Sequence, residues 1–96
     1  AQAVLDEYGQ ISPQMASAMA RAARERLGTD VGVGITGVAG PGEAEGQPAG
    51  TMHIAIEDRG RERVSSSVYP RGRLDVKRVA TLRALNLVRR SLLGLP

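Results

Sequence analysis

The chain has 96 residues, 42% of them hydrophobic, which fits one small globular domain and excludes a disordered segment. The absence of cysteine and the single histidine, His53, exclude disulfide scaffolds, cysteine-based zinc sites and multi-histidine metal sites. We therefore expect no metal and no cofactor. No apolar run approaches the length of a membrane span and no signal peptide pattern opens the chain, so we expect a cytoplasmic protein without a membrane partner.

The formal charge of +3 comes from 13 basic and 10 acidic residues, and the basic residues fall into two groups, at 21–26 and 59–90. Glutamate and aspartate are interleaved with them, and the only aromatic residues are Tyr8 and Tyr69. Direct nucleic-acid binding requires a basic stripe together with stacking or readout elements. We therefore favour solvated helix faces over a nucleic-acid partner as the explanation of the basic groups.

Helical patterns occupy the first third of the chain. Residues 1–8 resemble the end of a helix without a start signal, and the chain begins with alanine, from which we expect a piece of a longer protein. Ser12 and Pro13 form a helix start, because serine can cap backbone N–H groups and proline suits the first helical position. Small and apolar residues recur every three or four positions up to Leu27, and Gly28 ends the pattern.

A strand is predicted next, because Val31, Val33 and Ile35 alternate with small residues up to Thr36. Its second face consists largely of glycine, at Gly32 and Gly34. Glycine weakens a strand and usually marks a close approach to the backbone. Two explanations stay open from the sequence alone, a helix packed tightly on the sheet or a bound ligand.

The remaining pattern predicts a long loop over 37–50, a strand over 51–57, a turn at 58–60, a strand over 62–69 and a closing helix over 73–93. Helices that flank a sheet form a layered α/β domain. We expect a three-layer α/β/α sandwich with a mixed sheet, represented here by about three strands and two main helices. Such a sheet has at least one bare edge, which is a liability unless further strands cover it.

The loop that follows the first strand is the best candidate site. Thr36 ends a buried strand, and ligands of open α/β sheets bind at the carboxyl ends of strands. The glycines after it could turn their N–H groups toward one anion, although an ordinary connection explains them as well. The length of the loop favours a function. Glu43 and Glu45 are interpreted as solvated, and His53 as a packing or surface histidine.

The closing helix indicates a second wall of the site. Arg73 and Lys77 fall on the same helical face as Ala80 and Ala84 but within the first turn. Burying a cation on the core-facing side of a helix costs free energy. A cation at the N-terminus is also repelled by the positive end of the helix dipole. A bound phosphate would offset both costs, whereas side chains that snorkel to solvent would need no ligand.

Residues 33–42, VGITGVAGPG, together with the preceding ISPQMASAMARAARERLGTDVG and the later PAGTMHIAI, resemble the C-terminal domain of CinA, the nicotinamide-nucleotide amidase family. The resemblance covers nearly the whole chain from Tyr8 onward, and TGVAGPG is its specific part. The family's F-x-G-D-R-like segment is matched loosely by 69–73, with the glycine displaced and the acidic residue absent. The resemblance therefore supports a role for Arg73 through a looser match than the one that supports Thr36.

The resemblance implies hydrolysis of nicotinamide mononucleotide to nicotinic acid mononucleotide and ammonia, in a protein that is commonly a homo-oligomer. It implies a catalytic role for Thr36 and a small-molecule nucleotide substrate held by a set of surrounding residues, namely Gly37, Ala39, Gly40, Pro41, Gly42, Arg73 and Lys77. The family's serine nucleophile, in a Ser-Cys-Thr-Gly-Gly segment, and its lysine base have no counterpart in this chain.

We therefore expect residues 1–96 to form the C-terminal part of a single CinA-like amidase domain, without the N-terminal part that holds the nucleophile. The chain alone is expected to be inactive as an amidase. Two other functions stay open. One is a non-catalytic phosphate- or nucleotide-binding module, and the other is a basic domain associated with nucleic acid.

Overall fold

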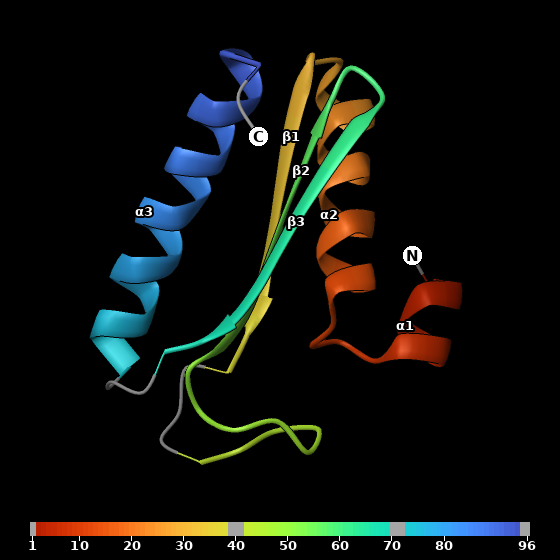
Figure 1. The fold of residues 1–96 in the computed structure, drawn as a ribbon. Coiled ribbons are helices and arrows are strands. Elements are labelled where there is room, and N and C mark those ends of the chain that lie inside the picture. The colour runs from red at the N-terminus through yellow and green to blue at the C-terminus, as the bar shows by residue number, and fades with distance from the viewer. Residues whose placement is uncertain (1, 39–41, 70–72, 95–96) are drawn as a thin grey trace.

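The computed structural model describes residues 2–38, 42–69 and 73–94, with the backbone alone at 73–77. Within these residues six elements follow one another: α1 (Gln2–Tyr8), α2 (Pro13–Leu27), β1 (Val31–Gly37), β2 (Thr51–Asp58), β3 (Arg61–Val68) and α3 (Arg73–Leu92). Helix α2 covers one face of the sheet and α3 the other (Figure 1). The predicted three layers are confirmed, and the predicted elements are present.

Helix α2 begins and ends where its sequence signals lie. The Ser12 hydroxyl accepts a hydrogen bond from the backbone N–H of Met15 at 3.0 Å, and Pro13 occupies the first turn. Gly28 ends the helix in the left-handed conformation, with φ of 65°. The helix therefore needs no tertiary contact to define its limits, and its small face, Ala16 and Ala20, is left for packing on the sheet.

The three strands lie in the order β1-β2-β3, and both pairs are antiparallel. The expectation of a mixed sheet is therefore wrong for these strands. A parallel pair needs a long crossover, usually a helix, whereas β2 and β3 are joined by a tight turn at Arg59 and Gly60. Both turn residues have positive φ, 51° and 87°, as a two-residue hairpin of type I′ requires.

The glycine face of β1 is explained by helix packing. A Cβ atom at Gly32 or Gly34 would lie 2.1 Å from the carbonyl oxygen of Ala20 or Ala16, respectively. The backbone of α2 thus rests directly on β1, which only glycine on the strand and alanine on the helix permit. Of the two explanations that the sequence left open, the structure selects the helix.

The opposite face of the sheet is covered by α3. Met52 and Ile54 of β2 pack against Ala80 and Ala84, with Tyr69, Val79 and Leu87 at the border. Every residue of β2 is buried, because helices cover both of its faces and a strand lies on either side. Side chains that project from β2 toward either helix layer are therefore held in fixed positions.

Candidate active site

Thr36 lies near the C-terminal end of β1, as predicted. Its side chain is half-buried, and its hydroxyl donates a hydrogen bond to the backbone carbonyl oxygen of Gln10 at 2.7 Å. In the sheet register Thr36 is opposite His53, which in turn is opposite Ser66. Directly paired residues point to the same face of a sheet, so these three polar side chains form one row across all three strands. The row faces the layer that contains α2.

The loop between β1 and β2 is tied to the connection between α1 and α2 by side chains. The Glu45 carboxylate accepts hydrogen bonds from the backbone N–H of Gln10 at 3.1 Å and of Ile11 at 2.9 Å. The Gln47 amide nitrogen donates to the carbonyl oxygen of Ile11 at 2.5 Å. Glu45 is exposed, as predicted for a solvated side chain, but it also makes two backbone hydrogen bonds that were not predicted. Its partners are 34 and 35 positions away, a pairing that no local pattern reveals.

Thr36, Glu45 and Gln47 together bind all four backbone polar groups of Gln10 and Ile11. This short segment lies between α1 and α2 and belongs to neither, so its backbone groups have no partners within a helix. The side chains supply the hydrogen bonds that its backbone would otherwise take from water. As a result, the carbonyl oxygen of Gln10 is held in one position, and the orientation of the Thr36 hydroxyl is determined with it.

His53 is a buried histidine with both ring nitrogens in hydrogen bonds. Nδ1 lies 2.8 Å from the Ser66 hydroxyl and Nε2 lies 3.0 Å from the Gln47 amide oxygen. Desolvation by burial lowers the pKa of His53, which favours the neutral ring. The expected packing role is confirmed, but the hydrogen bonds of His53 to Ser66 and Gln47 were not predicted. The predicted hairpin turn was a signal for the first of them, because a turn at 59–60 places residue 53 opposite residue 66.

The glycines of the loop have two different surroundings. A Cβ atom at Gly37 would lie 2.3 Å from the carbonyl oxygen of Thr51, so the approach of β2 explains this glycine without a ligand. Gly42 faces open space. Ala39, Gly40 and Pro41 lie outside the described residues, and their predicted role in binding substrate stays a prediction.

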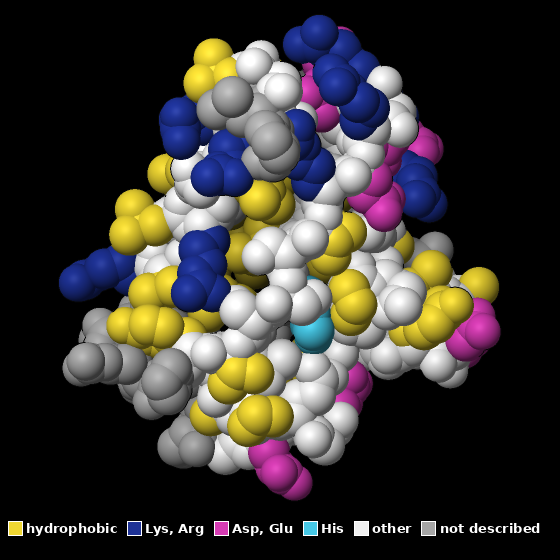
Figure 2. Space-filling view, in the orientation of Figure 1, with side chains coloured by type: hydrophobic (Ala, Val, Ile, Leu, Met, Phe, Trp, Pro, Cys, Tyr) yellow, Lys and Arg dark blue, Asp and Glu magenta, His cyan; other side chains and the backbone are white. Residues whose placement is uncertain are grey.

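Arg73 and Lys77 belong to the first turns of α3, and their side chains lie outside the described part of the structure. The ribbon places the start of α3 at the end of the sheet where β1 ends and the loop 42–50 begins (Figure 1). The face shown in Figure 2 has described basic side chains both around the β2–β3 hairpin and along α3. The backbone of Arg73 and Lys77 therefore lies toward the end of the sheet that holds Thr36, and their predicted role in binding substrate stays a prediction.

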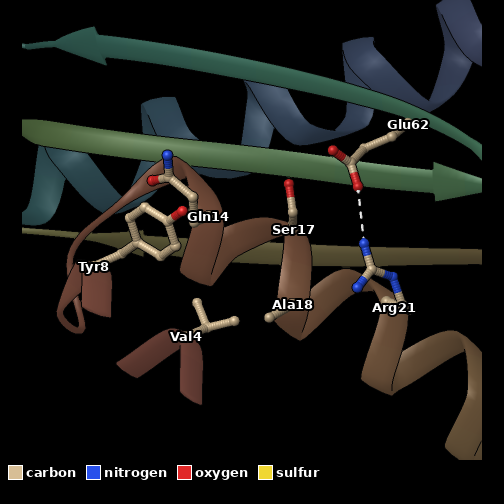
Figure 3. Close-up of a pocket in the computed structure, with 7 residues that line it drawn as sticks. All are labelled: Val4, Tyr8, Gln14, Ser17, Ala18, Arg21 and Glu62. Carbon is tan, nitrogen blue, oxygen red and sulfur yellow. Dashed lines mark hydrogen bonds and ion pairs between the residues drawn. The ribbon is translucent and has the colours of Figure 1, made fainter. Parts of the chain in front are cut away.

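The structure also contains a pocket of about 250 Å³ between α1, α2 and β3 (Figure 3). Arg21 extends across it toward Glu62, whose carboxylate lies 3.5 Å from the Arg21 guanidinium. The pocket is lined by none of the predicted site residues; its lining is Val4, Tyr8, Gln14, Ser17, Ala18, Arg21 and Glu62. It is therefore separate from the row of Thr36, His53 and Ser66.

In the described part of the chain, no three histidine, cysteine, aspartate or glutamate side chains lie together in a group that could hold a metal ion. Among the same residues, no helix is long and apolar enough to cross a membrane.

Comparison with known proteins gives consistent matches. The sequence model of the family described as the CinA C-terminal domain matches residues 1–92. A protein of Streptococcus agalactiae named as competence-damage inducible is 50% identical over 90 residues, which are 93% of this chain and 22% of that protein. A similarly named protein of Streptococcus pneumoniae is 42% identical over 91 residues, 94% of this chain and again 22% of its relative.

Solved structures match at the level of the fold. A CinA superfamily protein from Escherichia coli superposes with a TM-score of 0.88 at 32% identity, over 94% of this chain and 53% of that one. A competence/damage inducible protein from Agrobacterium tumefaciens gives a TM-score of 0.85 at 30% identity, over 92% of this chain and 55% of that one. The chain thus spans about a fifth of the curated relatives and about half of the solved chains.

Proposed function

Since the chain belongs to the CinA C-terminal domain family, we propose that it supplies one wall of an active site that hydrolyses the carboxamide of a nicotinamide mononucleotide-like substrate. Water and the amide give a carboxylate and ammonia. The position of Thr36 is the main support. A half-buried hydroxyl at the carboxyl end of β1, beside a loop that Glu45 and Gln47 tie to the helical layer, suits a residue that contacts substrate.

The hydrogen bond from Thr36 to Gln10 determines what this hydroxyl can do. A hydroxyl has one hydrogen to donate and two lone pairs. Because the hydrogen is donated to the Gln10 carbonyl oxygen, only the lone pairs are left for a ligand. Thr36 therefore accepts a hydrogen bond from a substrate N–H group, such as that of a carboxamide. A carboxylate product has no such hydrogen, so this contact favours substrate over product.

None of the chain's serines lies in a Ser-Cys-Thr-Gly-Gly segment, which holds the family's nucleophile. Three of them also have structural partners: Ser12 caps α2, Ser91 donates to Asp58, and Ser67 accepts a hydrogen bond from Arg83. We therefore keep the proposal that the nucleophile and its base belong to a part of the domain not contained in these 96 residues. Arg73 and Lys77 are proposed to hold the phosphate of the substrate from the start of α3.

The test measures binding of nicotinamide mononucleotide and of nicotinic acid mononucleotide to the chain by NMR titration. We expect the amide to bind about three- to tenfold more tightly, the effect of one neutral hydrogen bond. Thr36→Val removes the hydroxyl at nearly constant shape and is expected to abolish the preference, whereas Thr36→Ser retains it. If neither nucleotide perturbs residues 36–50, the proposal is wrong.

A second candidate, a phosphate-binding module without catalysis, predicts a different result. Such a module binds both nucleotides equally and also inorganic phosphate, and Thr36→Val leaves its affinity unchanged. The measured ratio of the two affinities therefore separates the two functions. Release of ammonia from the mononucleotide by the chain alone is expected to stay at background.

A further inference from the structure

The side chains of Ser66, His53 and Gln47 form a connected chain of hydrogen bonds whose direction can be worked out. The Gln47 amide nitrogen donates to the Ile11 carbonyl oxygen, so the amide oxygen is the atom that faces His53. An amide oxygen only accepts, and therefore His53 carries its hydrogen on Nε2. The other ring nitrogen, Nδ1, then presents a lone pair to the Ser66 hydroxyl.

The arrangement of Ser66, His53 and Gln47 is that of a serine activated by a histidine base. A nucleophilic hydroxyl, a neutral imidazole base within hydrogen-bond reach and a third group that orients the imidazole are the parts that covalent catalysis by serine requires. The distances are 2.8 Å from Ser66 to Nδ1 and 3.0 Å from Nε2 to Gln47. The third group is itself anchored, because Gln47 is held by the backbone of Ile11.

The surroundings differ for the base and for the nucleophile. His53 is only 9% exposed and keeps its neutral form by burial, whereas Ser66 is exposed on the edge strand β3. Val64 and Val68 project from the same face of β3 on either side of Ser66 and are 43% and 56% exposed. A short apolar acyl group could rest on these two valines while its carbonyl carbon meets the hydroxyl.

We propose that Ser66, with His53 as its base and Gln47 as the positioning residue, is a second reactive centre that accepts acyl groups from small activated carboxylic esters. The Ser66 oxygen attacks the ester carbonyl while its proton passes to His53 Nδ1. Collapse of the adduct breaks the bond to the alcohol, which takes that proton. Water, deprotonated by His53, then releases the carboxylic acid and restores the serine. The centre does not depend on the amidase proposal.

The two neighbouring serines, Ser65 and Ser67, serve as internal controls for the reactivity of Ser66. Ser65 and Ser67 are its immediate neighbours and point to the opposite face of the sheet, toward α3, where Ser67 accepts a hydrogen bond from Arg83. Neither is paired with a histidine, since His53 is the only one in the chain. The three hydroxyls share the same strand, so a difference in their reactivity reflects the imidazole.

The experiment treats the 96-residue chain with p-nitrophenyl acetate and with a fluorophosphonate, and maps the adducts by mass spectrometry. We expect a single adduct, on Ser66, and none after Ser66→Ala, a change at an exposed position. His53→Gln is expected to lower the labelling rate about a hundredfold, the usual effect of a general base. Added imidazole should restore part of the rate in His53→Gln but not in Ser66→Ala.

Two results would overturn this proposal. Equal labelling of Ser65, Ser66 and Ser67 would show that the histidine contact does not activate the hydroxyl. Absence of any adduct on Ser66 in the folded chain, monitored by NMR under the same conditions, would show the same. Both results are measured as adducts on the unmodified chain, so they do not depend on whether the His53 variant folds. Neither involves binding of a nucleotide, so they are also independent of the amidase proposal.

Discussion

The Glu45 carboxylate binds the backbone N–H of Ile11 at 2.9 Å and thereby joins the loop between β1 and β2 to the start of the helical layer. Glu45 itself has a positive φ of 51°, which is uncommon for a residue other than glycine. The backbone therefore takes an unfavourable conformation where the side chain makes its two hydrogen bonds. This contact organises the end of the molecule that contains Thr36.

Glu45→Ala is expected to lower the free energy of unfolding by about 2 kcal/mol, because charge-assisted hydrogen bonds are lost and two N–H groups lose their partners. Glu43→Ala, an exposed glutamate of the same loop, is the matched control and should change stability by less than about 0.5 kcal/mol. Urea denaturation measures both. Hydrogen exchange at the Ile11 amide should accelerate only in the Glu45 variant. Unchanged exchange there would contradict the contact.

Gly34→Ala should destabilise the protein strongly, by about 3 kcal/mol, because the new methyl group would overlap the Ala16 carbonyl oxygen and push α2 away from the sheet. Gly42→Ala introduces the same methyl group into open space and is the control. Thermal unfolding compares the two variants. Similar melting temperatures would mean that α2 does not rest on β1 as closely as described.

Arg24→Met should cost about 2 kcal/mol of stability. Its guanidinium donates to the buried Glu57 carboxylate at 3.0 Å, and a second cation, Arg21, lies 3.5 Å from that carboxylate. Removing Arg24 leaves the buried charge with the exposed Arg21 as its remaining partner. Arg26→Met, on an exposed position of the same helix, serves as the control. A double variant with Glu57→Gln should recover part of the loss, and strict additivity of the two changes would argue against this coupling.

The stability of the protein should fall as the pH drops below about 6.5, with a contribution from His53. Burial lowers the pKa of His53 in the folded state, so the unfolded chain takes up the proton first and acid favours unfolding. Above that pH the ring is neutral in both states and contributes nothing. Urea midpoints at pH 7.5, 6.5 and 5.5 test this, with His53→Gln as the reference that lacks the titrating ring. Identical pH profiles for the two proteins would exclude the contribution.

The secondary elements could be predicted from sequence because each depends on local periodicity and punctuation. Ser12, Pro13 and Gly28 delimit α2 through their own backbone chemistry. The tight turn at Arg59 and Gly60 sets the register of the hairpin. By contrast, the expected mixed sheet was wrong for the described strands, since strand direction depends on how connections cross the sheet.

The candidate site was predicted only in part. Thr36 and its place at the end of β1 followed from the pattern, but its partner Gln10, and the pairing of Glu45 with the same segment, did not. These contacts join residues about 25 to 35 positions apart, and no periodicity relates them. The roles of Arg73 and Lys77 stay predictions, because only the backbone of these residues is described.

The elements, their order and the glycine face of β1 can be read from neighbouring residues, because local backbone preferences and side-chain alternation act over short distances. Three features depend instead on how the elements pack: α2 rests on the glycine face, the Thr36 hydroxyl donates to Gln10, and His53 connects Gln47 with Ser66. Hydrogen-bond direction depends on which donors and acceptors meet in space. That meeting is set by the packing of whole helices and strands, which no single segment specifies.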